Sequence, residues 1–225
     1  MLAIYFAHIK MSAIMKRIRP AHRKTFVFID ASNIRYACRN SSGFEIDFSK
    51  YIAYLKRKYK NLVEVRCYEG ISNNDAKKKK YFEWLKNEGY IICSLERKAY
   101  VGKAKFKIYS CCNCETKNSV QILSDNVKLK SNVDVYLASN MIKCAIKNSG
   151  SIHIVLVSCD GDYAEAIKDI IEINPESFVT IVATPRCRKN NCLSSRLRVL
   201  RCEFSDNVML MNIEKIKDII SSDKK

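Results

Sequence analysis

Short apolar runs, rich in β-branched and aromatic residues, recur along the chain and stop at polar or turn residues. They occupy residues 25–30, 62–68, 90–95, 152–157 and 178–183. A continuous apolar run of this kind is typical of a strand that is buried on both faces of a parallel sheet. The pattern therefore predicts a mostly parallel sheet of about five strands.

The segments between these runs carry apolar residues at helical spacing. One helical face is formed by Phe48, Tyr51, Ile52, Leu55 and Tyr59. Weaker helical patterns occupy 78–89 and 163–171, and further helices are expected near 193–199 and 213–220. Strands that alternate with helices form βαβ units, whose helices cover both faces of the sheet. The hydrophobic pattern thus predicts an α/β fold.

Residues 98–129 break this alternation. Two extended stretches, VGKAKFKIYS and SVQILSDNVKL, flank a cysteine-rich segment, which predicts an inserted β-hairpin with a cysteine knuckle at its tip. We expect an N-terminal extension over 1–23, one domain over 24–220 that contains the hairpin, and a short tail over 221–225.

Acidic residues close two of the predicted strands. Asp30 ends the first, and Asp160 and Asp162 follow the fourth in VLVSCDGDYAEAI. Ligands of open α/β sheets bind beyond the carboxyl ends of the strands, so these carboxylates lie where chemistry is expected. Gly161 is expected to let the backbone turn tightly between the two acids, and Asp162 to gain from the dipole of the next helix.

A fourth acid, Asp134, belongs to a predicted helix in VDVYLASNMIKCAI. It shares a helical face with Leu137, Ala138, Met141 and Ala145. An acid that faces a core is costly unless it is paired, caps a helix or binds a cation. Capping and metal binding are compatible, and the sequence leaves both open for Asp134.

Clustered carboxylates repel one another, and a divalent cation relieves that repulsion. Oxygen ligands favour Mg²⁺ or Mn²⁺, either of which can polarise a phosphodiester and activate a water molecule. The charge of the chain agrees with such a substrate, because 40 lysines and arginines against 23 acids give a formal +17. This excess favours nucleic acid first and an anionic membrane second, although solvated surface lysines alone would also produce it. The two features together indicate a nuclease.

Composition narrows the class of protein. The chain has 225 residues, 48% of them hydrophobic, which suits one domain with a substantial core. Scarce glycine (6) and proline (3) exclude collagen-like and low-complexity classes. The 11 cysteines without a convincing export signal indicate a reducing compartment, so a cytoplasmic protein is expected. No run reaches the roughly 18 apolar residues of a membrane span, so no membrane partner is expected. The sequence gives no indication of the oligomeric state.

Three blocks of the sequence resemble the NYN domains, a family within the PIN-like ribonucleases. They are FIDASNI at 28–34, KSNVDVYLASNM at 130–141 and VLVSCDGDYAEAI at 155–167. The resemblance implies a Rossmann-like three-layer α/β/α sandwich that hydrolyses RNA with Mg²⁺ or Mn²⁺. It also implies that the metal-binding and catalytic set is Asp30, Asp134, Asp160 and Asp162.

The same blocks suggest supporting residues. Asn33 is expected to orient Asp30 or a phosphate through its amide, Ser158 to support the acids, and Lys130 and Asn140 to lie near the substrate.

The chain departs from the family pattern at a few positions. Ala31 and Cys159 stand where the family usually has glycine, and Asn140 stands where aspartate is common. Asn140 is also turned about 120° from Asp134 on an ideal helix. The missing charge either weakens a second metal site or matters little.

Cys111 and Cys114 have the spacing of a zinc knuckle. Four-coordinate zinc needs two more ligands, and Cys187 and Cys192, in the loop after the fifth strand, are the predicted partners. A structural Zn²⁺ ion would then clamp the hairpin near the active site. A redox pair and simple loop thiols are the alternatives.

Two other functions stay open at this point. A non-catalytic RNA-binding module with a decayed site is compatible with the charge and with Asn140. A phosphatase or nucleotidase acting on small phosphate esters uses similar acids, but it leaves the large positive charge unexplained.

Overall fold

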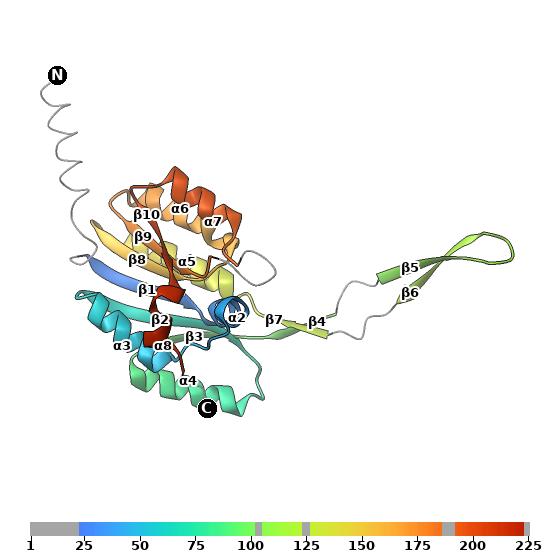
Figure 1. Ribbon diagram of the computed structural model, residues 1–225, viewed down its shortest axis with the longest axis horizontal. Helices are drawn as coiled ribbons and strands as arrows, with labels where there is room; N and C mark the ends of the chain where they lie inside the picture. The colour runs from blue at the N-terminus through green and yellow to red at the C-terminus, as the bar shows by residue number, and fades with distance from the viewer. Residues whose placement is uncertain (1–22, 102–104, 123–126, 186–191, 223–225) are drawn as a thin grey trace, which may run out of the picture.

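A six-stranded parallel sheet forms the centre of the protein (Figure 1). The computed structural model describes residues 23–101, 105–122, 127–185 and 192–222. The strands lie in the order β10-β9-β8-β1-β2-β3, and every neighbouring pair is parallel. Their bounds are β1 Lys24–Asp30, β2 Leu62–Ile71, β3 Ile91–Glu96, β8 Ile152–Val157, β9 Phe178–Ala183 and β10 Val208–Asn212.

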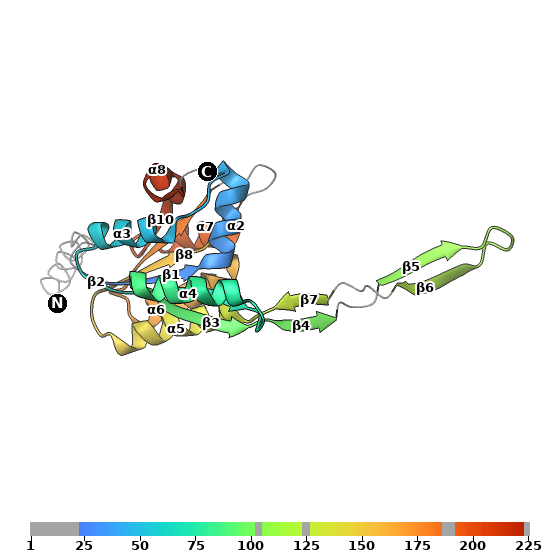
Figure 2. The same cartoon turned by 90° about the horizontal axis from the view of Figure 1, so that it is seen from below.

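Helices cover both faces of this sheet (Figure 2). Their bounds are α2 Ala31–Ser42, α3 Phe48–Lys58, α4 Ala76–Glu88, α5 Val133–Lys147, α6 Ala164–Ile173, α7 Ser195–Glu203 and α8 Lys217–Ile220. Helices α5 and α6 pack together on one face, whereas α3 packs with α8 on the other. The predicted three-layer α/β/α sandwich is therefore confirmed. Within the described part of the chain, none of the helices combines the length and the apolar character needed to cross a bilayer.

All the strands predicted from the apolar runs are present, and β10 is an addition. Its sequence, VMLMN, is short and lies at the edge of the sheet, where only Val208 is buried. An edge strand of this kind lacks the continuous burial that identified the others. The predicted N-terminal extension, apart from Arg23, lies outside the described residues.

The order of the strands reverses between β1 and β8. From β1 the chain moves outward to β2 and β3, and from β8 it moves the other way to β9 and β10. In open parallel sheets a crevice forms at the carboxyl ends of the strands where the order reverses. Asp30 ends β1, and Ser158 follows β8, so both lie at this switch point.

The inserted hairpin is confirmed and consists of two successive strand pairs. Strand β4 (Lys98–Val101) pairs with β7 (Val127–Lys130), and β5 (Lys105–Ser110) pairs with β6 (Lys117–Ile122), both antiparallel. Neither pair joins the central sheet. Both views show them extending away from the sandwich as an arm (Figures 1 and 2).

His153 is buried within β8, with 1% of its surface exposed. Its Nε2 lies 2.8 Å from Thr180 Oγ1, and its ring packs edge-on against Tyr59 at 5.2 Å between centroids. Burial, with a smaller effect of the positive charges of Arg23 and Lys58, lowers the pKa of His153 from 6.5 to about 3. It is a core residue, and its ring is neutral in the folded state at neutral pH.

This burial predicts acid sensitivity. Between its unfolded and folded pKa values, about 6.5 and about 3, His153 binds a proton only in the unfolded chain. Its contribution to folding is therefore complete above the unfolded pKa and is lost as pH falls, by about 1.4 kcal/mol per pH unit. We expect the free energy of unfolding, measured with urea, to fall less steeply below neutral pH in His153→Gln than in the wild type. Parallel pH profiles would contradict this assignment.

Candidate active site

Asp30 is held at the end of β1 by hydrogen bonds to both carboxylate oxygens. The Asn33 N–H donates to Asp30 Oδ1 over 3.1 Å, and the Tyr163 hydroxyl donates to Asp30 Oδ2 over 3.0 Å. The first bond caps helix α2, and the second comes from the loop after β8. Because Asp30 is only 6% exposed, these contacts fix its position.

The electrostatics of Asp30 show which other acids approach it. Burial raises the pKa of Asp30, the hydrogen bonds from Asn33 and Tyr163 oppose that rise, and the negative charges of Asp160 and Asp134 add to it. Asp160, in the loop after β8, and Asp134, in α5, are therefore near enough to Asp30 for their charges to act on it. Burial and the charge of Asp30 also raise the pKa of Tyr163, so its hydroxyl stays protonated and remains a donor.

Hydrogen bonds fix the loop after β8, both within the loop and to helix α2. Asp160 Oδ1 accepts from the Asp162 N–H at 3.0 Å, and the Asp160 N–H donates to Ser158 Oγ at 3.2 Å. Asn33 Oδ1 accepts from the Cys159 N–H at 2.9 Å. Asn33 thus orients Asp30 through its backbone N–H, whereas its side-chain amide fastens α2 to the loop that carries Asp160.

Gly161 is needed for a close approach between two segments. A Cβ at this position would lie 2.2 Å from Ser194 Oγ and 2.9 Å from Ser194 Cβ. The Ser194 N–H donates to the Cys159 carbonyl at 3.0 Å, which keeps the start of α7 against this loop. Gly161 also begins the 3-10 turn Gly161–Tyr163 between the two acids, but its φ is not positive, since the described glycines with positive φ are Gly43, Gly89 and Gly150.

Asp134 lies in the first turn of α5 and is half-buried. The N-cap of α5 is Asn132, so Asp134 is not the capping residue, although its place in the first turn suits the helix dipole. Leu137 and Met141, which share its face, are fully buried. Among the described residues, no hydrogen bond or ion pair joins another side chain to the Asp134 carboxylate.

Asp162 is separated from the other three acids by its orientation. Its side chain is exposed, and its Oδ1 lies 3.5 Å from the Arg196 guanidinium, which also contacts Glu165 at 3.3 Å. The backbone N–H of Asp162 serves Asp160, but its carboxylate faces α7. The charges of Asp134 and Asp160 act on Asp30, whereas the Asp162 carboxylate is paired with Arg196.

Two of the predicted supporting residues lie elsewhere. Asn140 lines a hollow with Phe26, Glu64 and Arg66, toward the N-terminal ends of β1 and β2 and away from Asp30. Lys130 is exposed at the end of β7, where the arm returns to the sandwich.

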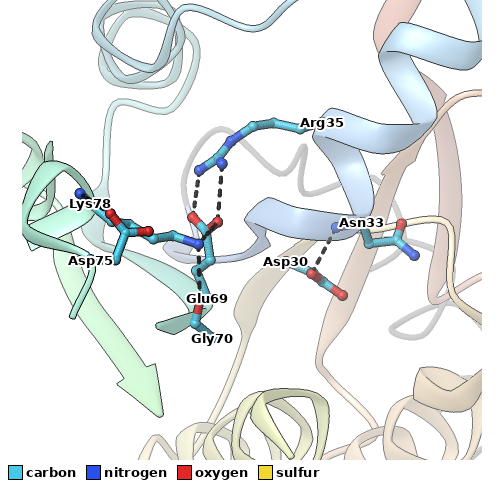
Figure 3. Close-up of polar contacts among 7 residues, drawn as sticks. All are labelled: Asp30, Asn33, Arg35, Glu69, Gly70, Asp75 and Lys78. Carbon is cyan, nitrogen blue, oxygen red and sulfur yellow. Dashed lines mark hydrogen bonds and ion pairs between the residues drawn. The ribbon is translucent and has the colours of Figure 1, made fainter. Parts of the chain in front are cut away.

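A buried ion-pair cluster beside Asp30 was not predicted from the sequence. Glu69 is one residue beyond Tyr68, the partner of Asp30 in the β1–β2 register, and is 2% exposed. Arg35 donates to Glu69 Oε1 at 3.1 Å and also to Oε2, and Lys78 Nζ lies 2.6 Å from Glu69 Oε1 (Figure 3). The cluster fastens α2 and α4 to the end of β2.

The carboxylates of the candidate site suit a hard dication, but they are not arranged as a formed metal site. Asp30, Asp134 and Asp160 provide only oxygen donors, the chemistry preferred by Mg²⁺ and Mn²⁺. Among the described residues, no three Cys, His, Asp or Glu side chains already stand in the arrangement of a metal site. The three acids are therefore not already arranged around one ion.

The structure does not bring the predicted zinc cysteines together. Cys111 and Cys114 lie at the tip of the arm, whereas Cys192 is disulfide-bonded and precedes α7. A disulfide sulfur is not the thiolate that zinc requires. Cys187 lies outside the described residues. Cys38, Cys67, Cys93 and Cys144 are buried in the core as free thiols.

Comparisons with known proteins agree with this architecture. The family model of the NYN domain matches residues 24–192. No curated protein matches the sequence. A crystal structure of a protein of unknown function from Vibrio parahaemolyticus aligns with a TM-score of 0.57 and 19% identity, over 91% of this chain and 100% of that chain. At that identity the likeness supports the fold alone.

Proposed function

The chain belongs to the NYN domain family, a PIN-like group of ribonucleases, and we propose that it is a metal-dependent ribonuclease that hydrolyses RNA phosphodiester bonds. The observation that carries the proposal is that Asp30 is buried at the switch point of the sheet, where the charges of Asp134 and Asp160 add to its own. Repulsion between these carboxylates would favour the binding of a dication at this edge of the sheet.

Asp30, Asp134 and Asp160 would hold Mg²⁺ or Mn²⁺. A dication bound there would polarise the phosphodiester and lower the pKa of an attacking water molecule. Other residues of the protein hold these ligands in position. Tyr163 and the Asn33 N–H keep Asp30 in one orientation, and Ser158 keeps the Asp160 backbone in place. A ligand held by such outer partners needs less reorganisation when substrate binds.

The net charge of +17 supports RNA as the substrate class, because phosphate contacts release counterions and favour binding. A small phosphate ester would not need so large an excess. A non-catalytic RNA-binding module is the second candidate. It is favoured by the open geometry of the acids and by Asn140, whose position is commonly aspartate in the family.

A pair of matched variants tests the proposal. We expect Asp160→Asn to lose most Mn²⁺-dependent cleavage of a labelled single-stranded RNA, because the charge of Asp160 adds to that of Asp30 at the proposed metal site. Asp162→Asn makes the same chemical change two positions away, on a carboxylate paired with Arg196, and is expected to keep most activity. Cleavage is followed on denaturing gels, and RNA affinity by fluorescence anisotropy in EDTA.

The outcomes separate the two candidates. RNA binding that persists in EDTA, weakens with salt and never leads to cleavage by the wild type would establish the binding module instead. Equal cleavage by the wild type and Asp160→Asn, after removal of contaminating nucleases, would show that the activity does not use this site.

A further inference from the structure

The tip of the arm presents a pair of cysteines that the proposed active site does not use. Strand β5 ends at Ser110 and strand β6 begins at Lys117. The segment between them contains Cys111 and Cys114. Both views place this segment at the far end of the arm from the sandwich (Figures 1 and 2). Cys114 is exposed, and Cys111 is partly exposed.

Backbone hydrogen bonds close the turn that carries the two thiols. The Cys111 N–H donates to the Thr116 carbonyl at 3.0 Å, and the Glu115 N–H donates to the Cys111 carbonyl at 2.9 Å. Glu115 adopts the left-handed conformation, with φ of 55°, that folds the chain back. Hydrogen bonds from Thr116 and then from the Cys111 thiol lower the pKa of Cys114, which favours the thiolate form that binds metal.

Two thiolates supply half of a structural zinc site. Zinc in such sites takes four ligands in a tetrahedron, and a CxxC pair at the end of a hairpin is a common half of it. Among the described residues, no third histidine, cysteine or carboxylate joins the pair. The disulfide-bonded Cys192 lies on the sandwich and offers no thiolate.

The same pair of thiolates on a second copy of the chain has the chemistry of the missing half. A two-fold axis at the tip would bring the same pair of thiolates from each copy to one ion, since an isologous contact repeats every ligand. From the geometry of the arm we infer that Cys111 and Cys114 of two copies together bind one Zn²⁺ ion, which joins the arms into a symmetric dimer.

Two features of the arm support a partner of this kind. An isolated pair of strands is marginally stable in water, and here β5 and β6 expose Ile108, Tyr109 and Val120 at 68%, 49% and 49%. A second arm can cover part of that apolar surface. Lys107 and Lys117 near the tip would repel their copies, but a zinc ion with four thiolates carries net negative charge and offsets this repulsion.

The test measures mass and metal content together. The full chain, freed of metal and kept reduced with a phosphine, is analysed by sedimentation and light scattering before and after addition of ZnCl₂. We expect a monomer without metal and a dimer with about one zinc ion per two chains. Cobalt is expected to give the intense visible absorption of a tetrahedral thiolate site.

Variants locate the site and separate it from the ribonuclease proposal. Cys111→Ser and Cys114→Ser are expected to stay monomeric with zinc, whereas Cys112→Ser, the exposed neighbour outside the pair, dimerises normally. Asp160→Asn is expected to dimerise like the wild type. The inference is overturned by one zinc ion per monomer, by no zinc retention, by a dimer that persists in EDTA, or by equal behaviour of Cys112→Ser and Cys111→Ser.

Discussion

Replacing Asp30 with asparagine is expected to lower Mn²⁺-dependent RNA cleavage by at least about 100-fold. The charges of both Asp134 and Asp160 act on Asp30, and among the three acids Asp30 alone has both oxygens held by hydrogen bonds between described residues. The substitution removes its charge and one acceptor while keeping the shape of the side chain. Initial cleavage rates over a range of Mn²⁺ concentrations measure the effect.

A folding control separates this loss from unfolding. Because burial and neighbouring acids raise the pKa of Asp30, the ionised carboxylate disfavours the folded state above that pKa when no metal is bound. The metal-free variant is therefore expected to melt at neutral pH no lower than the wild type in EDTA. A folded Asp30→Asn protein with undiminished cleavage would contradict the role given to Asp30.

Replacing Glu69 with alanine is expected to reduce the free energy of unfolding by about 3–5 kcal/mol. The substitution leaves the Arg35 and Lys78 side chains, only 26% and 17% exposed, without the carboxylate that both contact. It also detaches α2 and α4 from the end of β2 beside Asp30 (Figure 3). Guanidinium unfolding followed by circular dichroism measures the change.

Glu83→Ala provides the control for this prediction. Glu83 also pairs with a lysine, Lys86, but the two side chains are 69% and 51% exposed. An exposed pair of this kind contributes between 0 and about 1 kcal/mol, so this variant should unfold close to the wild type. Similar losses in Glu69→Ala and Glu83→Ala would mean that burial does not set the importance of the Glu69 cluster.

The sheet could be predicted from the sequence because its central strands are apolar without interruption. Strand β8 is buried along its whole length, and β1 is buried from Thr25 onward, so periodicity and burial agree. The inserted hairpin could also be predicted, because its two extended stretches interrupt the alternation of strands and helices along the chain. Strand β10 was not, because an edge strand with one buried residue resembles a loop.

The candidate site was only partly predictable. Asp30 was found because an acid closed an apolar strand, and the same rule applied to Glu69 would have marked the end of β2. Tyr163 was missed because a buried tyrosine in a helical pattern looks like any core residue until its hydroxyl is seen to donate to Asp30. Spacing could not show that Asp162 turns outward, since Arg196 comes from a distant helix.

The most direct test of the account is the location of bound manganese in crystals of the wild type and of Asp30→Asn. Anomalous scattering at the manganese edge identifies the ion without reference to activity. The account predicts a wild-type peak in coordination contact with Asp30 and with at least one of Asp134 and Asp160, and no such peak in Asp30→Asn. A wild-type crystal with manganese bound elsewhere, or with the same peak after the substitution, would contradict it.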